Sequence, residues 1–136
     1  MASDTGALRA HVLVVDDEAT VRRFTARVLC DVGCRVSEAA DGEEALSLVR
    51  QGASPVDVVV TDIVMPRVNG VELLRQLAAS HPRLPVILMS GYAAADLTGL
   101  GITPPCAVLG KPFPAERLVE EVRRCLQGMG RLAASG

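Results

Sequence analysis

Four apolar segments of this sequence each end in side chains that are suited to phosphate or metal chemistry. The residues at these ends are Asp16, Asp17, Asp62, Ser90 and Lys111. Three carboxylates held close together repel one another and raise one another's pKa values unless a cation joins them. Hard oxygen ligands with space left for water suit Mg²⁺, which demands octahedral geometry. A metal-bound carboxylate beside one ammonium and one hydroxyl group resembles a site in which an aspartate accepts a phosphoryl group.

Each of these residues also has a simpler interpretation. Aspartate and serine often cap the helix that follows a strand, and a lysine before a proline is often a solvated turn. The joint pattern is harder to explain in this way, because four of the five predicted strands end in complementary chemistry. Lys111 adds weight, since it is the single lysine in a chain with thirteen arginines. Its compact ammonium group is not equivalent to a planar guanidinium.

The elements that must position these side chains are short apolar runs that alternate with segments of helical periodicity. The runs predict strands at His11–Val15, Arg35–Glu38, Val56–Thr61, Pro85–Met89 and Cys106–Leu109. Helices are predicted from about Ala19 to Asp31, from Gly42 to about Gln51 after an Asp41 N-cap, from Asn69 onward, and from Pro114 to about Gln127. In the first of these helices, Val21, Phe24 and Val28 are expected to share the apolar face.

Strands that alternate with helices predict a parallel sheet with right-handed crossovers and helices on both faces. In such a sheet the ligand site lies beyond the carboxyl ends of the strands, where the strand order reverses. With the five-stranded order 2-1-3-4-5, the Asp16-Asp17 pair and Asp62 face each other across that point. The segment Ala93–Pro105 contains two glycines and two prolines, so a fourth helix there is predicted to be short or partly irregular.

The bulk properties of the chain limit the alternatives. Its 136 residues are expected to form one domain, with a core over about residues 11–127 and flexible ends. No apolar run is long enough to cross a bilayer, and the first ten residues do not read as a secretory signal. A net charge of −2 without a basic block argues against a nucleic-acid surface. The four cysteines form no metal-binding pattern and are expected to be small buried thiols in a reducing cytoplasm; they are Cys30, Cys34, Cys106 and Cys125.

The ordered set of motifs resembles the response-regulator receiver domains of two-component signalling, which have a flavodoxin-like fold. The resemblance covers about His11 to Leu126 and is specific as a set rather than in any single motif. Its motifs are Val14-Val15-Asp16-Asp17-Glu18, Thr61-Asp62-Ile63-Val64-Met65-Pro66 with Asn69-Gly70, Ser90-Gly91, and Lys111-Pro112-Phe113. The last two, with Tyr92, are similar to receivers that are fused to hybrid histidine kinases.

The resemblance implies a role for each matching residue. Asp62 is the expected phosphoacceptor, Lys111 is expected to pair with the phosphoryl group, and Ser90 to hydrogen-bond to it. The Lys111–Pro112 bond is expected to be cis, an isomer that an X-Pro bond adopts at low cost. The expected ligands of Mg²⁺ are Asp17 directly, Asp16 mainly through water, Asp62, and the backbone carbonyl of Val64.

The implied activity is Mg²⁺-dependent acceptance of a phosphoryl group from a phosphohistidine, followed by switching of protein–protein contacts. Expected partners are a histidine kinase or histidine phosphotransfer protein and a downstream protein effector, with no direct contact to nucleic acid or membrane. Such a domain is not a turnover enzyme, but promotes phosphorylation and dephosphorylation of its own Asp62 in the cytoplasm. One departure from the family is Val108, which stands where members often carry Tyr or Phe. The short fourth helix also alters a surface through which many receivers dimerise.

Three other classes of protein fit parts of the pattern. A flavodoxin-like FMN carrier shares the predicted architecture, but the acidic residues Asp16-Asp17-Glu18 would repel its phosphate. Haloacid-dehalogenase-type phosphatases use aspartyl chemistry with a DxD pattern after the first strand, where this chain has two adjacent aspartates. A receiver that serves only as an interaction scaffold is the third alternative, and the complete set of site residues weighs against it.

Overall fold

The computed structural model describes residues 8–51, 54–65, 69–91 and 105–128. Within these ranges the chain forms one parallel sheet in the order β2-β1-β3-β4-β5. Its strands are β1 His11–Val15, β2 Arg35–Ala39, β3 Val58–Asp62, β4 Val86–Ser90 and β5 Ala107–Gly110. The helices are α2 Ala19–Asp31, α3 Gly42–Gln51, α4 Gly70–Ser80 and α5 Ala115–Gly128. The predicted fold class and strand order are confirmed, and each strand end lies within two residues of its predicted position.

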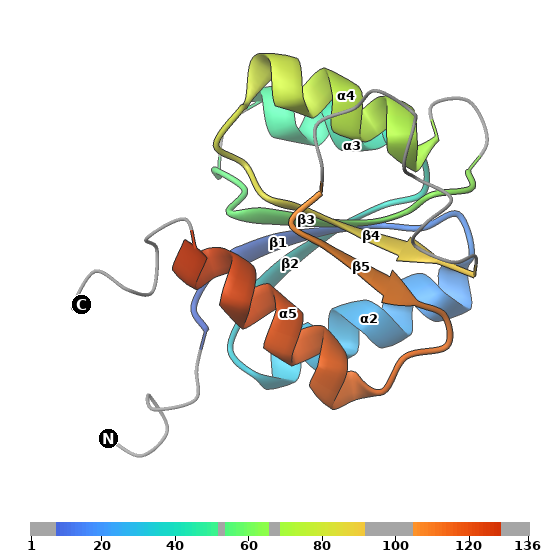
Figure 1. The fold of residues 1–136 in the computed structure, drawn as a ribbon, viewed down its shortest axis with the longest axis vertical. Helices are drawn as coiled ribbons and strands as arrows, with labels where there is room; N and C mark the ends of the chain where they lie inside the picture. Colours follow the sequence, from blue (N-terminus) through green and yellow to red (C-terminus); the bar gives the residue numbers. More distant parts are fainter. Residues whose placement is uncertain (1–7, 52–53, 66–68, 92–104, 129–136) are drawn as a thin grey trace.

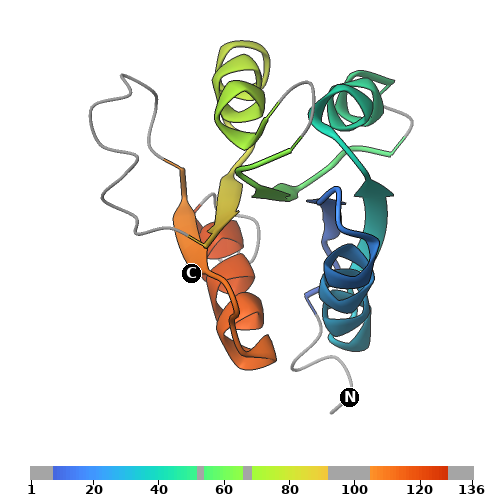
Figure 2. The ribbon, with the colours of Figure 1, turned by 90° about the vertical axis from the view of Figure 1, so that its right-hand side faces the viewer.

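Helices cover both faces of the sheet, with α3 and α4 on one side and α2 and α5 on the other (Figures 1 and 2). The side chains of β1 alternate between these two layers. Val14 belongs to a buried cluster that includes Leu118 of α5, whereas Val15 belongs to a second cluster that includes Leu73 of α4. Because both faces are covered, all five residues of β1 are buried, which explains why this strand is a continuous apolar run.

The buried face of α2 differs from the face expected from its sequence. Phe24 is 48% exposed, and Val21 and Val28 are only partly buried. The buried residues of this helix are instead Thr25, Ala26 and Leu29. Successive residues of a helix lie about 100° apart, so the observed buried face is adjacent to the expected one. The small side chains of Thr25 and Ala26 on this face allow α2 to lie close to the sheet. None of the helices in the described ranges is both long and apolar enough to cross a membrane.

The start of α4 lies directly against the backbone of β3. The Asn69 side chain caps the helix by accepting a hydrogen bond from the Glu72 N–H at 2.9 Å. The Gly70 N–H donates to the Ile63 carbonyl at 2.8 Å. A Cβ atom on Gly70 would overlap the carbonyl oxygen of Asp62 and lie 2.8 Å from the Ile63 Cα. A glycine at this position therefore permits the close approach of α4 to the end of β3.

The expectation that all four cysteines are buried thiols is wrong. Cys106 and Cys125 form a disulfide between the residue before β5 and the last turns of α5, with their Cα atoms 6.1 Å apart. Cys30 is a free thiol but is exposed. Only Cys34 fits the prediction, and burial raises its pKa to about 11. The disulfide could not be predicted from the sequence, because 19 positions separate the two cysteines and only the packing of α5 on the sheet brings them together.

Some of the expectations fall on parts of the chain that are not described. The short fourth helix predicted over Ala93–Pro105 lies there, apart from Pro105 itself. The predicted flexible ends, before Leu8 and after Gly128, also lie outside the described residues.

Candidate functional site

The carboxyl ends of the strands bring the predicted site residues together at one edge of the sheet. Asp16 directly follows β1, Asp62 is the last residue of β3, Ser90 is the last residue of β4, and Lys111 directly follows β5. The strand order reverses between β1 and β3, so the two carboxylates flank the switch point of the fold. The strand of Ser90 lies between the strands that lead to Asp62 and Lys111.

Three carboxylates form a compact acidic cluster at this edge. Asp16, Asp17 and Asp62 each offer one oxygen, and these oxygens all lie within 4.8 Å of one another. Asp16 is fully buried, Asp62 is partly buried and Asp17 is exposed, so the cluster is open to solvent on the side of Asp17. The predicted proximity of the acidic pair and Asp62 is thereby confirmed.

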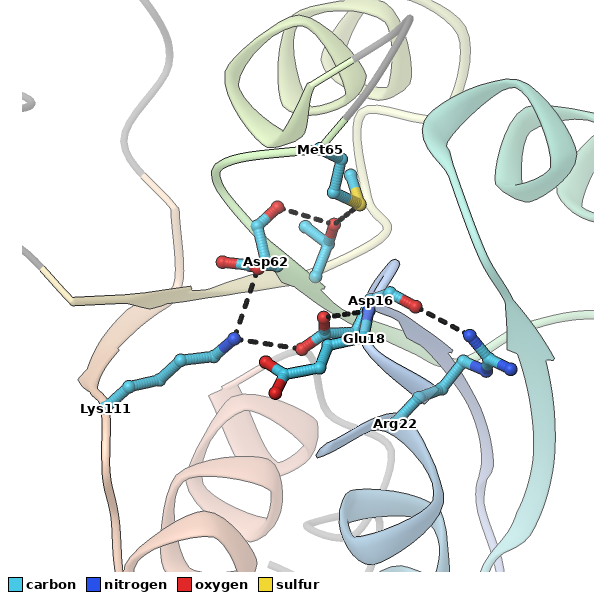
Figure 3. A network of polar contacts seen from close by, with 7 residues as sticks. Asp16, Glu18, Arg22, Asp62, Met65 and Lys111 are labelled. Carbon is cyan, nitrogen blue, oxygen red and sulfur yellow. Dashed lines mark hydrogen bonds and ion pairs between the residues drawn. The ribbon is translucent and has the colours of Figure 1, made fainter. Parts of the chain in front are cut away.

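The ammonium group of Lys111 bridges two members of this cluster (Figure 3). Its Nζ lies 3.0 Å from Asp16 Oδ2 and 3.1 Å from Asp62 Oδ2. Burial alone would lower the pKa of Lys111, but the hydrogen bonds and the negative charges of Asp16 and Asp62 together outweigh burial and raise it. Lys111 therefore remains a cation between the two aspartates.

The surroundings of Asp62 disturb the ionisation of its carboxyl group. Burial raises its pKa above the ordinary value, the hydrogen bond and charge of Lys111 oppose this rise, and the neighbouring charge of Asp16 adds to it. Asp62 thus lies in an environment where one ammonium group does not fully compensate the loss of solvent. A second cation at the acidic cluster would stabilise its charged form.

The backbone around Lys111 places its side chain at the site. The Lys111 N–H donates to the Ser90 carbonyl at 2.7 Å, which extends the pairing of β5 with β4 beyond Gly110. The peptide bond between Lys111 and Pro112 is cis, as predicted. Phe113 then packs against the cluster that α2 and α5 share, so the chain turns sharply from the site into α5.

The donor set of the acidic cluster fits a hard divalent cation. It consists of carboxylate oxygens without nitrogen or sulfur ligands, and its open side leaves room for water molecules, as Mg²⁺ requires. Val64, whose carbonyl is a further predicted ligand, lies in the loop two residues beyond β3, and its side chain is 61% exposed.

One charged residue near the site was missed by sequence reasoning. Arg22 on α2 donates from Nη1 to the backbone carbonyl of Asp16 at 2.9 Å, and its Nε lies 3.0 Å from Glu38 Oε1 on β2. Residues on the first turns of a helix point back toward the preceding strand end, so a position six residues after Asp16 is compatible with this contact but does not predict it. Nothing in the sequence distinguishes Arg22 from its neighbour Arg23.

Fold and site together define a class of protein: a doubly wound α/β domain that holds an acidic cluster, a hydroxyl residue and a lysine at its switch point. Comparison with known proteins makes this class specific. The chain matches the response regulator receiver domain over residues 12–123, and it belongs to this family of two-component signalling domains.

The chain resembles a sensor kinase, a receiver protein and solved receiver domains. It is 40% identical over 119 residues to the sensor kinase CckA of Brucella abortus, covering 87% of this chain but 13% of the kinase. It is 33% identical to the response regulator receiver protein CpdR of the same organism, covering 85% of this chain and 96% of that protein. The receiver domain of the hybrid histidine kinase CckA superposes with a TM-score of 0.71 at 36% identity, covering 86% and 99% of the two chains. A receiver domain protein from Clostridium thermocellum superposes with a TM-score of 0.81 at 28% identity, covering 90% and 98%.

Proposed function

We propose that this domain accepts a phosphoryl group on the carboxylate of Asp62, from a phosphohistidine and with the help of Mg²⁺. The observation that carries the proposal is the contact of this carboxylate with the Lys111 ammonium at 3.1 Å, within the acidic cluster that Asp62 forms with Asp16 and Asp17. An Asp62 oxygen attacks the phosphorus, and the bond between the phosphorus and the donor's imidazole nitrogen breaks. The electron pair stays with that nitrogen, which takes up a proton, and the product is an acyl phosphate.

Each neighbouring residue has a separate task in this reaction. Asp16, Asp17, Asp62 and the Val64 carbonyl are the groups that would hold the ion. When bound, Mg²⁺ would neutralise charge that develops on the equatorial phosphoryl oxygens. Lys111 releases its hydrogen bond to Asp62 and pairs with the phosphoryl group, and Ser90 donates a hydrogen bond to the same group.

The proposal describes a signalling domain rather than a turnover enzyme. Its partners are a histidine kinase or histidine phosphotransfer protein and a downstream protein effector, and it acts in the cytoplasm without direct contact to nucleic acid or membrane. The similarity to both a kinase-borne receiver and a short receiver protein supports either a free-standing regulator or a module of a hybrid kinase. Phosphorylation is read through switched protein–protein contacts.

The readout is expected to differ from receivers that use an aromatic residue on the fifth strand. Val108 is partly buried and packs against the cluster beneath α3 and α4. A branched side chain of this size cannot make the rotation between buried and exposed positions that an aromatic ring makes. We infer that residues other than Val108 transmit the effect of phosphorylation from Asp62 to the protein surface.

The experiment is phosphorylation with acetyl phosphate in the presence and absence of Mg²⁺, followed by intact-mass spectrometry. Wild-type protein is expected to gain the mass of one phosphoryl group, to need Mg²⁺ for this, and to lose the group in base. Asp62→Asn is the matched variant, since it keeps the shape of the side chain and removes the nucleophile. Modification of Asp62→Asn to the same extent, or no modification of wild type, would refute the proposal.

A further inference from the structure

The guanidinium group of Arg22 links Asp16, in the loop after β1 that carries the proposed metal ligands, to Glu38 on the neighbouring strand β2. The Arg22 side chain is 16% exposed although it lies on α2 near the surface. Nη1 donates to the main-chain oxygen of Asp16 at 2.9 Å, and Nε donates to Glu38 Oε1 at 3.0 Å. Figure 3 shows that Arg22 and Lys111 approach Asp16 from opposite sides, one at its backbone and the other at its carboxylate.

The oxygen that Arg22 contacts belongs to the peptide bond between Asp16 and Asp17. The orientation of this peptide therefore sets where the Asp17 side chain begins. Other hydrogen bonds also hold the loop: the Asp16 N–H donates to the Ala39 carbonyl at 3.1 Å, and the Glu18 N–H donates to Asp16 Oδ1 at 2.9 Å. Among these contacts, only that of Arg22 brings a positive charge.

The charge of Arg22 is placed differently from that of Lys111. Lys111 contacts the carboxylates themselves and, in the proposed reaction, has to release Asp62 in order to pair with the phosphoryl group. Arg22 contacts the backbone, and Glu38 holds its other side in place. The guanidinium can therefore stay where it is throughout metal binding and phosphorylation, because a planar group with two fixed partners keeps its geometry at low entropic cost.

We propose that Arg22 is a positioning residue for the metal-binding pair: it orients the Asp16–Asp17 peptide, and Glu38 orients Arg22. This inference rests on the proposed function in one respect, namely that the pair holds a divalent cation. Partners that orient the ligands of a metal typically change metal affinity by 10-fold to 100-fold when they are removed. A merely structural ion pair between α2 and β2 would instead affect folding stability and leave metal affinity unchanged.

The experiment is titration of the protein with MgCl₂ by calorimetry, comparing wild type, Arg22→Met, Glu38→Gln and a control on the same helix. The control is Arg27→Met, because Arg27 forms an exposed ion pair with Asp31 at 3.9 Å, away from the acidic cluster. Arg22→Met is expected to raise the Mg²⁺ dissociation constant about tenfold. Glu38→Gln should raise it less, and Arg27→Met should leave it at the wild-type value. Arg22→Lys keeps the positive charge but can make only one of the two contacts, so its Mg²⁺ dissociation constant should lie between those of wild type and Arg22→Met. This variant also keeps the test available if Arg22→Met does not fold.

A second readout does not require metal. In metal-free protein, hydrogen exchange at the Glu18 amide, which donates to Asp16 Oδ1, should be faster in Arg22→Met than in Arg27→Met. Unchanged Mg²⁺ affinity and unchanged exchange in Arg22→Met would overturn the inference and leave the proposed function intact. Absence of Mg²⁺ binding in wild type would contradict the metal site itself, and with it both proposals.

Discussion

Replacing Gly70 by alanine tests whether the start of α4 positions the end of β3, which carries Asp62, the proposed phosphoacceptor. The added Cβ would overlap the Asp62 carbonyl oxygen and lie 2.8 Å from the Ile63 Cα and 2.9 Å from the Asp62 carbonyl carbon. All three atoms belong to the backbone, so no flexible side chain can move aside. The contact with Ile63 alone requires a shift of about 0.6 Å, from 2.8 Å to the 3.4 Å at which ordinary contact begins.

The expected cost follows from this overlap. Overpacking of a rigid site costs about 1–3 kcal/mol, which the better helix propensity of alanine offsets by about 1 kcal/mol at most. Taking the middle of the cost range, about 2 kcal/mol, less at most about 1 kcal/mol for helix propensity, we expect Gly70→Ala to lower the free energy of unfolding by about 1–2 kcal/mol. Because the atoms that must move carry Asp62, phosphorylation should also slow on the order of tenfold, since a misplacement of about 1 Å costs roughly a hundredfold in rate.

The assay combines urea denaturation with the rate of phosphorylation by acetyl phosphate, at a temperature where both proteins are folded. Gly128→Ala is the matched control, because a Cβ on Gly128 meets no atom within 4 Å and this glycine also lies in a helix. It should be as stable as wild type or more stable, with an unchanged rate. If Gly70→Ala matched Gly128→Ala in both stability and phosphorylation rate, α4 would not hold the end of β3 in place.

Two further predictions concern proton binding and the disulfide. In metal-free protein, Asp62 keeps its proton to higher pH when folded than when unfolded, so the free energy of unfolding should fall as pH rises from the ordinary pKa of 3.8 through the raised value. Denaturation at a series of pH values should show this slope in wild type but not in Asp62→Asn, and an equal slope in both would contradict it. Reduction of the Cys106–Cys125 disulfide by dithiothreitol should lower the free energy of unfolding by about 3 kcal/mol, because it frees a closed loop whose ends are 19 residues apart. Cys125→Ala should show the same loss without reductant, whereas a stability unchanged by reduction would show that the disulfide does not constrain the unfolded chain.

Most residues of the candidate site can be identified from the sequence because the pattern that marks them is local. Each site residue stands at the end of an apolar run, and such runs are recognisable without knowledge of the rest of the chain. Parallel strands place their carboxyl ends at one edge, so the alternation of strands and helices predicts that the site residues gather there. The assumed strand order then brings Asp16 beside Asp62. The cis bond before Pro112 was implied by the resemblance to the family.

Other features depended on which surfaces meet, and periodicity does not contain that information. The sequence favoured Phe24 for the buried face of α2, but the sheet accepts the smaller Thr25 and Ala26 there and leaves Phe24 exposed. The contact of Arg22 with the Asp16 carbonyl could not be told from the sequence either, because it depends on the distance between α2 and the end of β1.

The sequence by itself therefore determined the alternation of strands and helices, the edge at which the polar side chains gather and which residues these are. The strand order 2-1-3-4-5 was an assumption that the observed sheet confirms. Only the tertiary structure decided that Lys111 bridges Asp16 and Asp62 and that Cys106 pairs with Cys125. The physical reason is the range of the interactions: burial patterns repeat within a few residues, whereas hydrogen bonds and disulfides between distant segments require their atoms to meet within a few ångströms. That condition is met only after the helices have packed on the sheet.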